Sequence, residues 1–310
     1  MRLVIALGGN AMTGPDGSAT VAAQKAAIAA AAPAVARLLA EGHEVIVTHG
    51  NGPQVGNLLT KNELASSVVP QLPLDLCVAQ TQGGTGAMLL DALDGALAAA
   101  GLAKPVTVLV SRTLVSADDE AFAAPSKPIG RYVTADEAAT FVARGQVWEE
   151  RGAQGWRRMV ASPQPLEVLD APAAAALVEA GFLVVVSGGG GVPTVRTPSG
   201  TLDGVEAVVD KDLTANILAQ NLKADLLVIA TDVPNAVIGF GTPDAYPLEE
   251  VTVARLREHA AAGVFGSGSM GPKVEVVCRF VEATGRRAAI TSLETIGEAA
   301  AGRAGTRVVP

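Results

Sequence analysis

Lysine is scarce in this 310-residue chain, and three of its seven lysines occur in unusual surroundings. Lys127 lies in the segment PSKPIG, Lys211 lies between two aspartates in VVDKD, and Lys273 follows the loop GSGSMGP. A compact ammonium group suits a phosphate oxygen that is not bound bidentately. Because phosphoryl transfer requires mainly positive charge and in-line alignment, the three lysines indicate that chemistry. The alternative is that Lys211 only pairs with Asp210 or Asp212 and that Lys127 is a solvated loop charge.

Two carboxylates and one histidine near these segments each allow two interpretations. Asp212 could be the N-cap of a helix over residues 213–222, its carboxylate could hold Lys211 or another lysine in place, or it could do both. Asp232 follows an apolar run and could be a structural carboxylate or a nucleotide contact. His49 could act as a general base, but no carboxylate stands at a spacing that would orient it. We therefore interpret His49 as structural.

Four glycine-rich turns accompany the predicted strands and helices. Three follow a strand and one precedes a helix: residues 8–10 (GGN), 49–54 (HGNGPQ), 188–191 (GGGG) and 266–271 (GSGSMG). In an open α/β sheet, ligands bind beyond the carboxyl ends of the strands, where glycine lets backbone N–H groups close on a phosphate. One such turn is more often an ordinary connection that needs a positive φ. Four at equivalent places favour a phosphate site.

Three standard motifs do not fit these turns. A P-loop requires lysine directly after its second glycine, but Pro272 stands there and Lys273 comes one residue late. No GxGxxG opens a βαβ unit, so a dinucleotide site is not indicated. The serines show no G-x-S-x-G elbow, which argues against a serine hydrolase.

Apolar runs without period-two alternation predict strands buried on both faces: residues 3–7, 45–48, 106–110, 183–187 and 226–230. Longer Ala- and Leu-rich segments between them predict helices: residues 19–41, 53–65, 84–100, 172–180, 213–222, 252–262 and 272–284. This alternation predicts an α/β fold, a three-layer αβα sandwich with a mainly parallel central sheet.

Residues 113–165 interrupt the alternation and are richer in proline, charge and tryptophan. A structureless loop of that length is unusual inside a compact domain. We therefore expect one domain over residues 1–310, with a small protruding subdomain at about 113–165 that could act as a lid.

Composition excludes several classes of protein. The formal net charge is −8, and aromatic residues make up 3% of the chain, so neither the basic patch nor the stacking platform of a nucleic-acid binder is indicated. The two cysteines are far apart and have no CxxC or histidine partner, so neither a metal site nor a disulfide framework is expected. The N-terminus lacks a signal-like segment, and charged and proline residues interrupt the Ala-rich stretch at 21–40. We expect a cytoplasmic protein that binds neither nucleic acid nor membranes.

Nine segments in order closely resemble those of the carbamate kinases, within the amino acid kinase superfamily. They are ALGGNA, THGNGPQVGNLL, PLDLCVAQTQGG, DEAFAAPSKPIG, GWRRMVASPQP, SGGGGVP, GVEAVVDKDLTA, GSMGPK and AAITSLE, and the resemblance runs from about residue 3 to residue 309. Kinases of acetylglutamate, aspartate, glutamate 5-phosphate and UMP share the GG start and the sheet, but they generally lack PSKPIG and GWRRMV. In the family the lid motif usually reads KPIGP, and Arg131 replaces that last proline here.

The resemblance implies reversible transfer of the γ-phosphoryl group of ATP to carbamate, which gives ADP and carbamoyl phosphate. It also implies ATP synthesis in arginine breakdown as the useful direction, Mg²⁺ held largely by phosphates and water without a dedicated protein site, and a homodimer. The implied catalytic residues are Lys127, Lys211, Asp212 and Lys273. The implied substrate- and phosphate-binding residues are Gly8, Gly9, Asn10, Gly50, Asn51 and Gly52. The implied nucleotide-binding residues are Asp232, Phe240, Ser269 and Met270.

Two other functions remain possible at the level of sequence. Another amino acid kinase could phosphorylate a carboxylate such as that of acetylglutamate. A non-catalytic nucleotide-binding regulator could have kept the fold, although such a protein would be expected to lose some of the lysines, and all three are present.

Overall fold

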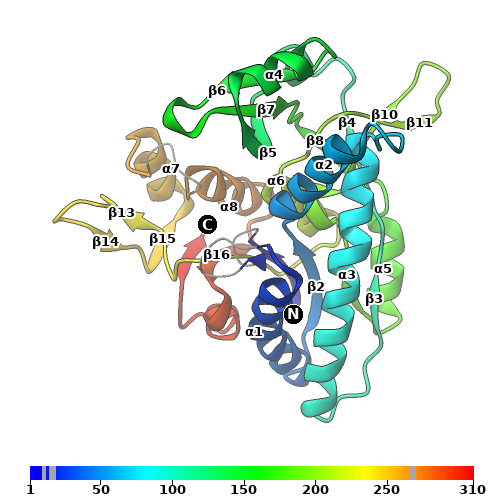
Figure 1. Ribbon diagram of the computed structural model, residues 1–310. Coiled ribbons are helices and arrows are strands. Elements are labelled where there is room, and N and C mark those ends of the chain that lie inside the picture. Colours follow the sequence, from blue (N-terminus) through cyan, green and yellow to red (C-terminus); the bar gives the residue numbers. More distant parts are fainter. Residues whose placement is uncertain (9–11, 14–18, 266–269) are drawn as a thin grey trace.

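A central sheet of eight strands organises the computed structural model, which describes residues 1–8, 12–13, 19–265 and 270–310 (Figure 1). Its strands, in spatial order, are β15 (Glu250–Thr252), β17 (Thr306–Val309), β16 (Arg287–Ser292), β12 (Leu226–Thr231), β1 (Arg2–Leu7), β2 (Glu44–His49), β9 (Leu183–Val185) and β3 (Val106–Val108). All neighbours from β16 to β3 pair in parallel. Among the described residues, the one antiparallel pair in this sheet is β16 with β17, and β15 pairs in parallel with β17. The predicted mainly parallel sheet is therefore confirmed.

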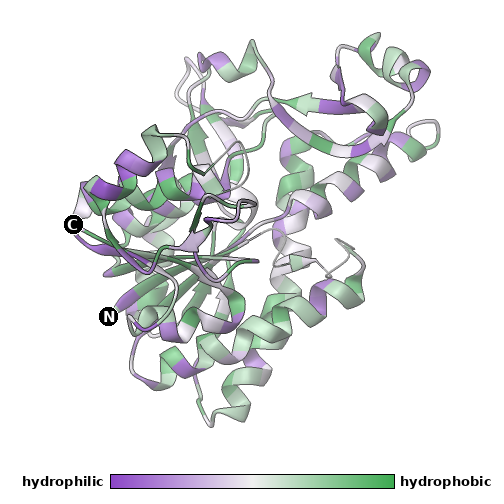
Figure 2. Cartoon of the chain, turned by 90° about the vertical axis from the view of Figure 1, so that its left-hand side faces the viewer, coloured by the Kyte–Doolittle hydropathy of each residue, from purple (hydrophilic) through white to green (hydrophobic). Residues whose placement is uncertain are grey.

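Helices cover both faces of this sheet, as its apolar strands require. Val4 and Ala6 of β1 pack into one apolar cluster with helices α5 to α8. Leu3 and Ile5 pack into a second cluster on the opposite face, because side chains alternate along a strand. The first layer of helices contains α5 (Ala171–Glu179), α6 (Lys211–Asn221), α7 (Val253–Ala261) and α8 (Met270–Thr284). The second contains α1 (Val21–Ala40), α3 (Leu74–Ala99) and α9 (Ile296–Ala300). Figure 2 shows the hydrophobic strands between the two layers, and the predicted αβα sandwich is confirmed.

Helix α3 begins ten residues before the predicted start at residue 84. Gly83 and Gly84 lie inside the helix with no atom of the described residues within 4 Å of an added Cβ, whereas Gly86 is closely packed. A Cβ on Gly86 would lie 2.5 Å from a methyl group of Val108, so glycine allows α3 to approach β3. In the part of the chain that the structure describes, no helix has the length and apolar character needed to cross a membrane.

Three smaller sheets lie around the central one. The strands of the first are β11 (Leu202–Gly204), β10 (Val192–Arg196), β4 (Arg112–Val115) and β8 (Pro165–Val168); the second is the hairpin of β13 (Val237–Ile238) and β14 (Tyr246–Pro247). The third contains β5 (Lys127–Val133), β7 (Trp156–Val160) and β6 (Val147–Glu150), and it carries α4 (Ala135–Val142).

The third small sheet projects from the rest of the molecule at the top of Figure 1. It has an apolar cluster of its own, in which Val133, Ala138 and Trp148 are buried and the ring of Trp148 stacks on Phe141 at 5.2 Å between centroids. This part lies inside the segment 113–165, whose two ends instead join the sheet of β4, β8, β10 and β11. A lid function for it stays a prediction.

Candidate functional site

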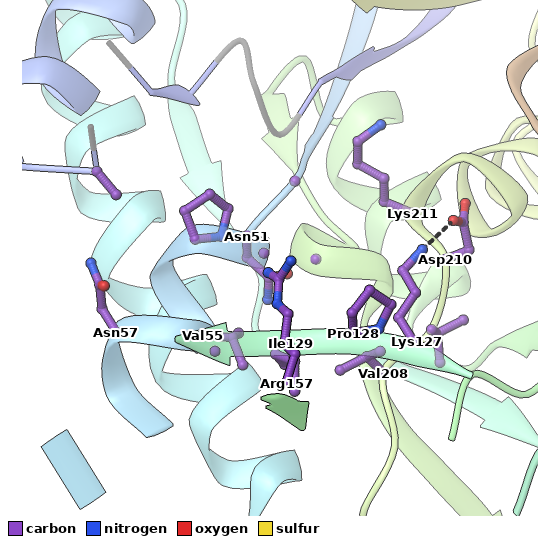
Figure 3. Close-up of a pocket in the computed structure, with 18 of the residues that line it drawn as sticks. Asn51, Val55, Asn57, Lys127, Pro128, Ile129, Arg157, Val208, Asp210 and Lys211 are labelled. Atoms are coloured by element: carbon purple, nitrogen blue, oxygen red, sulfur yellow. Dashed lines mark hydrogen bonds and ion pairs between the residues drawn. The ribbon is translucent and has the colours of Figure 1, made fainter. Parts of the chain in front are cut away.

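A cavity of about 820 Å³ opens where several strands end and several helices begin (Figure 3). One wall is the start of α2 (Gly52–Ala65), directly after β2. A second wall is formed by the starts of α6 and α8. Strand β5 of the projecting sheet crosses the cavity, so residues of that sheet face the helix starts here.

Asp212 lies between two lysines at the bottom of this site. The Nζ of Lys273 is 3.3 Å from Oδ2 of Asp212, and the Nζ of Lys211 donates to Oδ1 of the same carboxylate. The side chains of the two lysines are only 13% and 11% exposed, for Lys211 and Lys273 respectively. Three of the four predicted catalytic residues therefore form one buried cluster with two ammonium groups and one carboxylate.

The electrostatics of the cluster keep its carboxylate ionised. Burial alone would raise the pKa of Asp212, but the ammonium groups of Lys211 and Lys273 outweigh burial and hold that pKa below its usual value of 3.8. The cluster thus presents a net positive charge to the cavity, which suits an anion.

The prediction that Asp212 caps helix α6 is wrong, because the cap is Asp210. Its Oδ1 accepts hydrogen bonds from the backbone N–H groups of Asp212, at 2.9 Å, and Leu213, at 3.3 Å. Asp210 has the extended backbone of an N-cap, while Asp212 lies in the first helical turn, from which its carboxylate reaches the lysines. The other carboxylate oxygen of Asp210 lies 3.3 Å from the Nζ of Lys127, so this lysine is paired and not simply solvated.

The start of helix α2 brings three predicted residues, Gly50, Asn51 and Gly52, to the cavity wall. Asn51 stands at the N-cap position, but its side chain makes no capping hydrogen bond. Its Nδ2 instead donates to Oγ1 of Thr81 on α3, at 2.8 Å. The first turn of α2 therefore keeps backbone N–H groups without a side-chain cap, a favourable position for an anion.

The glycine run at 188–191 lies against these side chains and has no room for a Cβ. A Cβ on Gly188 would lie 2.3 Å from Nε2 of His49, and one on Gly189 would lie 2.0 Å from Nδ2 of Asn51. Gly189 also has a φ of +66°, which glycine adopts readily. The run thus supports the cavity wall from behind, and Gly189 itself lines the cavity.

His49 is completely buried and is neutral near pH 7. Its pKa is lowered to about 4, mainly by burial and also by the charge of Lys211, against the opposing effect of a hydrogen bond to the carbonyl of Gly50. Because a carbonyl only accepts, Nδ1 of the ring donates in that 2.9 Å hydrogen bond. This geometry agrees with our interpretation of His49 as structural.

The remaining predicted residues are spread around the sheet. Gly8 directly follows β1 and donates to the carbonyl of Ala230 at 2.7 Å, while Gly50 donates to the carbonyl of Leu7 at 3.0 Å, so both glycines lie at the same edge of the sheet. Asp232 follows β12 and accepts from Oγ1 of Thr231. Of the other predicted nucleotide residues, Met270 begins α8 and Phe240 is 79% exposed beside the β13–β14 hairpin. The predicted nucleotide residue Ser269 and the predicted substrate- and phosphate-binding residues Gly9 and Asn10 lie outside the described residues.

Sequence reasoning missed two basic side chains of the cavity. Arg131 on β5 pairs with Glu63 of α2 and with Glu137 of α4. Arg157 on β7 points across β5 toward Asn51 in Figure 3. In the sequence, position 131 stands out only as a departure from a motif. Position 157 lies in the segment GWRRMV, whose strand places alternate residues on opposite faces.

No group of three or more histidine, cysteine, aspartate or glutamate side chains suited to a metal ion occurs within residues 1–8, 12–13, 19–265 and 270–310. The two aspartates of the cavity, Asp210 and Asp212, are each paired with lysine. The described lining of the cavity carries five basic side chains against these two carboxylates, so its net charge is positive and suits an anion.

The chain is similar to known proteins over nearly its whole length. The carbamate kinase of Thermococcus kodakarensis is 44% identical over 313 residues, covering 99% of each chain. A carbamate kinase-like protein of Escherichia coli K12, YahI, is 39% identical over 311 residues, covering 99% of this chain and 98% of its own. The structure of carbamate kinase from Giardia lamblia bound to AMP-PNP superposes with a TM-score of 0.94 at 38% identity, covering 99% of this chain and 98% of that chain.

The resemblance predicted from the nine sequence segments is thereby confirmed over nearly the whole chain. The model of the amino acid kinase family also matches residues 1–292. The chain belongs to the amino acid kinase family.

Proposed function

We propose that this protein is a carbamate kinase, which transfers the γ-phosphoryl group of MgATP to carbamate and catalyses the reverse reaction. The observation that carries the proposal is the convergence of Lys127, Lys211 and Lys273 on one cavity in a chain that resembles carbamate kinases over nearly its full length. These lysines come from three separate elements, so their convergence is a property of the fold and not of a local sequence run.

The chemistry of carbamate explains why the site offers charge and no general base. Carbamate already carries an anionic oxygen that can attack phosphorus, so no proton has to be removed. The barrier comes from bringing two anions together, which the ammonium groups of Lys211 and Lys273 would lower. A neutral, buried His49 agrees with this requirement.

Each part of the site has a proposed role. The start of α2, at Gly50 to Gly52, would bind the acceptor. Lys211 and Lys273 would neutralise phosphate oxygens, Asp212 would orient both lysines, and Lys127 would reach in from the projecting sheet. Magnesium would enter with the nucleotide as part of the substrate, because the carboxylates of the cavity are already paired with lysines.

The nucleotide would lie toward the starts of α8 and the β13–β14 hairpin, near Asp232, Phe240 and Met270. We further propose ATP synthesis from carbamoyl phosphate as the direction used in the cell, in arginine breakdown. The projecting sheet would close over the substrates as a lid.

Formation of ATP from ADP, Mg²⁺ and carbamoyl phosphate by the purified protein tests the proposal. We expect ATP formation that depends on all three components. A parallel assay with ATP and acetylglutamate tests the main rival activity within the family. Activity on acetylglutamate without ATP formation from carbamoyl phosphate would contradict the proposed substrate, and activity on neither would favour a regulator.

A further inference from the structure

Arg157 differs from the other basic side chains of the cavity. The basic residues among the described lining of the cavity are Lys127, Arg131, Arg157, Lys211 and Lys273. Four of them form ion pairs with carboxylates: Lys127 with Asp210, Lys211 and Lys273 with Asp212, and Arg131 with Glu63 and Glu137. Within the described part of the chain, Arg157 pairs with no carboxylate. Its charge is therefore available to an anion that enters the cavity.

A neutral aromatic ring holds Arg157 in place. The guanidinium carbon lies 5.0 Å from the ring centroid of Tyr132, and Nη1 is 3.4 Å from the hydroxyl oxygen of the same tyrosine. The two residues face each other in the pairing of β5 with β7. A cation held on a π face is oriented without loss of its charge. Tyr132 thus orients the guanidinium and leaves it electrostatically available.

The hydrogen-bonding capacity of Arg157 is also incompletely used. Its Nε is buried and has no hydrogen-bond partner among the described residues. A buried donor without a partner costs free energy, and native structures seldom leave one without a reason. Of the two terminal nitrogens, Nη1 is 3.4 Å from the hydroxyl of Tyr132, and Nη2 makes no hydrogen bond among the described residues, so the terminal end of the guanidinium keeps donors for a ligand in the cavity.

The position of Arg157 separates it from the lysines. Figure 3 shows its guanidinium directed toward Asn51, at the start of α2, while Lys127 and Lys211 lie together on the other side of the cavity. The side chain of Asn51 does not cap α2, so the first N–H groups of the helix face the same region. The two sides of the cavity are therefore suited to two different anionic groups.

We propose that Arg157 binds the acceptor at the start of α2. Its guanidinium would bind the planar carboxylate of carbamate or, in the reverse reaction, the carbamoyl oxygen. This inference rests on the proposed function. A planar guanidinium matches two coplanar oxygens of a carboxylate, whereas the ammonium groups of Lys127, Lys211 and Lys273 suit the phosphoryl oxygens. Arg157 would then select for the acceptor, and the lysines would serve the transferred group.

Steady-state kinetics of ATP formation with Arg157→Gln test the assignment. We expect the KM for carbamoyl phosphate to rise by about tenfold to a hundredfold, the usual range for a lost charge-assisted hydrogen bond. The KM for ADP and the inhibition constant of inorganic phosphate should stay within about twofold of wild type, because the lysines would bind phosphate. Arg157→Lys keeps the positive charge but loses the two parallel N–H donors of the guanidinium. Its KM for carbamoyl phosphate should therefore lie between those of wild type and Arg157→Gln.

Arg158→Gln is the matched control, because the neighbouring residue of the same strand points to the opposite face. Arg158 lines a different cavity, of about 660 Å³, and lies 3.3 Å from Glu206. We expect Arg158→Gln to keep the wild-type KM values. A thermal unfolding midpoint for each variant shows whether it is folded.

Three results would overturn the inference. If folded Arg157→Gln keeps the wild-type KM for carbamoyl phosphate, Arg157 does not bind the acceptor, although the proposed function still stands. If the inhibition constant of inorganic phosphate rises by the same factor as the KM, Arg157 binds the phosphoryl group instead. If the wild-type protein forms no ATP, the proposed function fails, and the acceptor assigned to Arg157 fails with it.

Discussion

Lys127 and Asp210, which are 83 residues apart in the chain, are joined by an ion pair in which Nζ lies 3.3 Å from Oδ2. Lys127 belongs to the projecting sheet, and Asp210 caps α6, the helix that carries Lys211 and Asp212. The pair therefore connects the projecting sheet to the helix of the buried cluster of Lys211, Asp212 and Lys273. Under the proposed function, a phosphoryl group that bound Lys127 would have to compete with this carboxylate.

Replacing Asp210 by Asn separates its two interactions. Asparagine caps helices about as well as aspartate, so we expect a free energy of unfolding close to that of wild type. Because the ion pair is partly exposed and contributes at most about 1 kcal/mol, we expect the KM for carbamoyl phosphate to fall by up to about fivefold. Asp210→Ala also loses the cap and should lower the free energy of unfolding by about 0.5–2 kcal/mol. Equal destabilisation of the two variants in denaturant titrations would contradict this account.

Lys211→Ala should lower turnover by about a hundredfold or more. A preorganised charge on the transition state contributes about 3 kcal/mol, and Lys211 is held in position by a buried carboxylate. Lys61→Ala, at an exposed position of α2, is the control and should retain wild-type turnover. Turnover of Lys211→Ala near the wild-type value, measured with saturating ADP and carbamoyl phosphate, would remove Lys211 from the mechanism.

His49 should make the protein less stable in acid. Its pKa is about 4 in the folded state, against a usual value of 6.5, so the unfolded chain binds a proton between these values and the folded chain does not. The stabilisation is therefore complete above pH 6.5 and is lost as the pH falls toward 4. At pH 5 the loss amounts to about 2 kcal/mol.

Unfolding free energies at pH 7.5 and pH 5, measured for wild type and His49→Gln, check this dependence. The variant lacks the titrating ring, so its free energy of unfolding should change with pH by about 2 kcal/mol less than that of wild type. The same pH dependence in both proteins would show that the buried imidazole does not titrate as described.

Gly189→Ala should disrupt the acceptor side of the site. Alanine at this position would combine a positive φ with a contact of 2.0 Å to Nδ2 of Asn51, which Thr81 holds from the other side. Gly200→Ala is the matched control, since Gly200 has a φ of +87° but no atom within 4 Å of the added Cβ. We expect Gly200→Ala to cost about 1 kcal/mol and Gly189→Ala to cost about 3 kcal/mol or more, with loss of ATP formation. Equal unfolding midpoints for the two variants would mean that Asn51 moves aside freely.

Much of the fold could be predicted because burial leaves a direct trace in sequence. The five apolar runs that were identified as strands all lie in the central sheet, where helices cover both faces. Strand β16 (Arg287–Ser292) lies in the same sheet, but its polar ends and small residues gave a weaker pattern. Strands β15 and β17 have only three and four residues, which is too short for a long apolar run, and β15 also lies at an edge of the sheet.

The site could be predicted only where chemistry and local pattern coincide. Lys211, Asp212 and Lys273 stand out because their types are unusual next to the starts of helices, and the fold does bring them together. Which aspartate caps α6 depends on where the helix begins, and a shift of two residues exchanges the roles of Asp210 and Asp212. Arg157 has no such local signal, because its position over the cavity depends on how two strands of the projecting sheet pair.

Both tryptophans of the chain, Trp148 and Trp156, lie on strands β6 and β7 of the projecting sheet. The indole of Trp148 is buried against Phe141, and its Nε1 donates to Gln146. The eight-stranded sheet contains no tryptophan, so it contributes nothing to the tryptophan fluorescence of the protein. The tryptophan fluorescence of the whole protein therefore reports on this one small sheet, and movements of the sheet can be followed without attaching a dye.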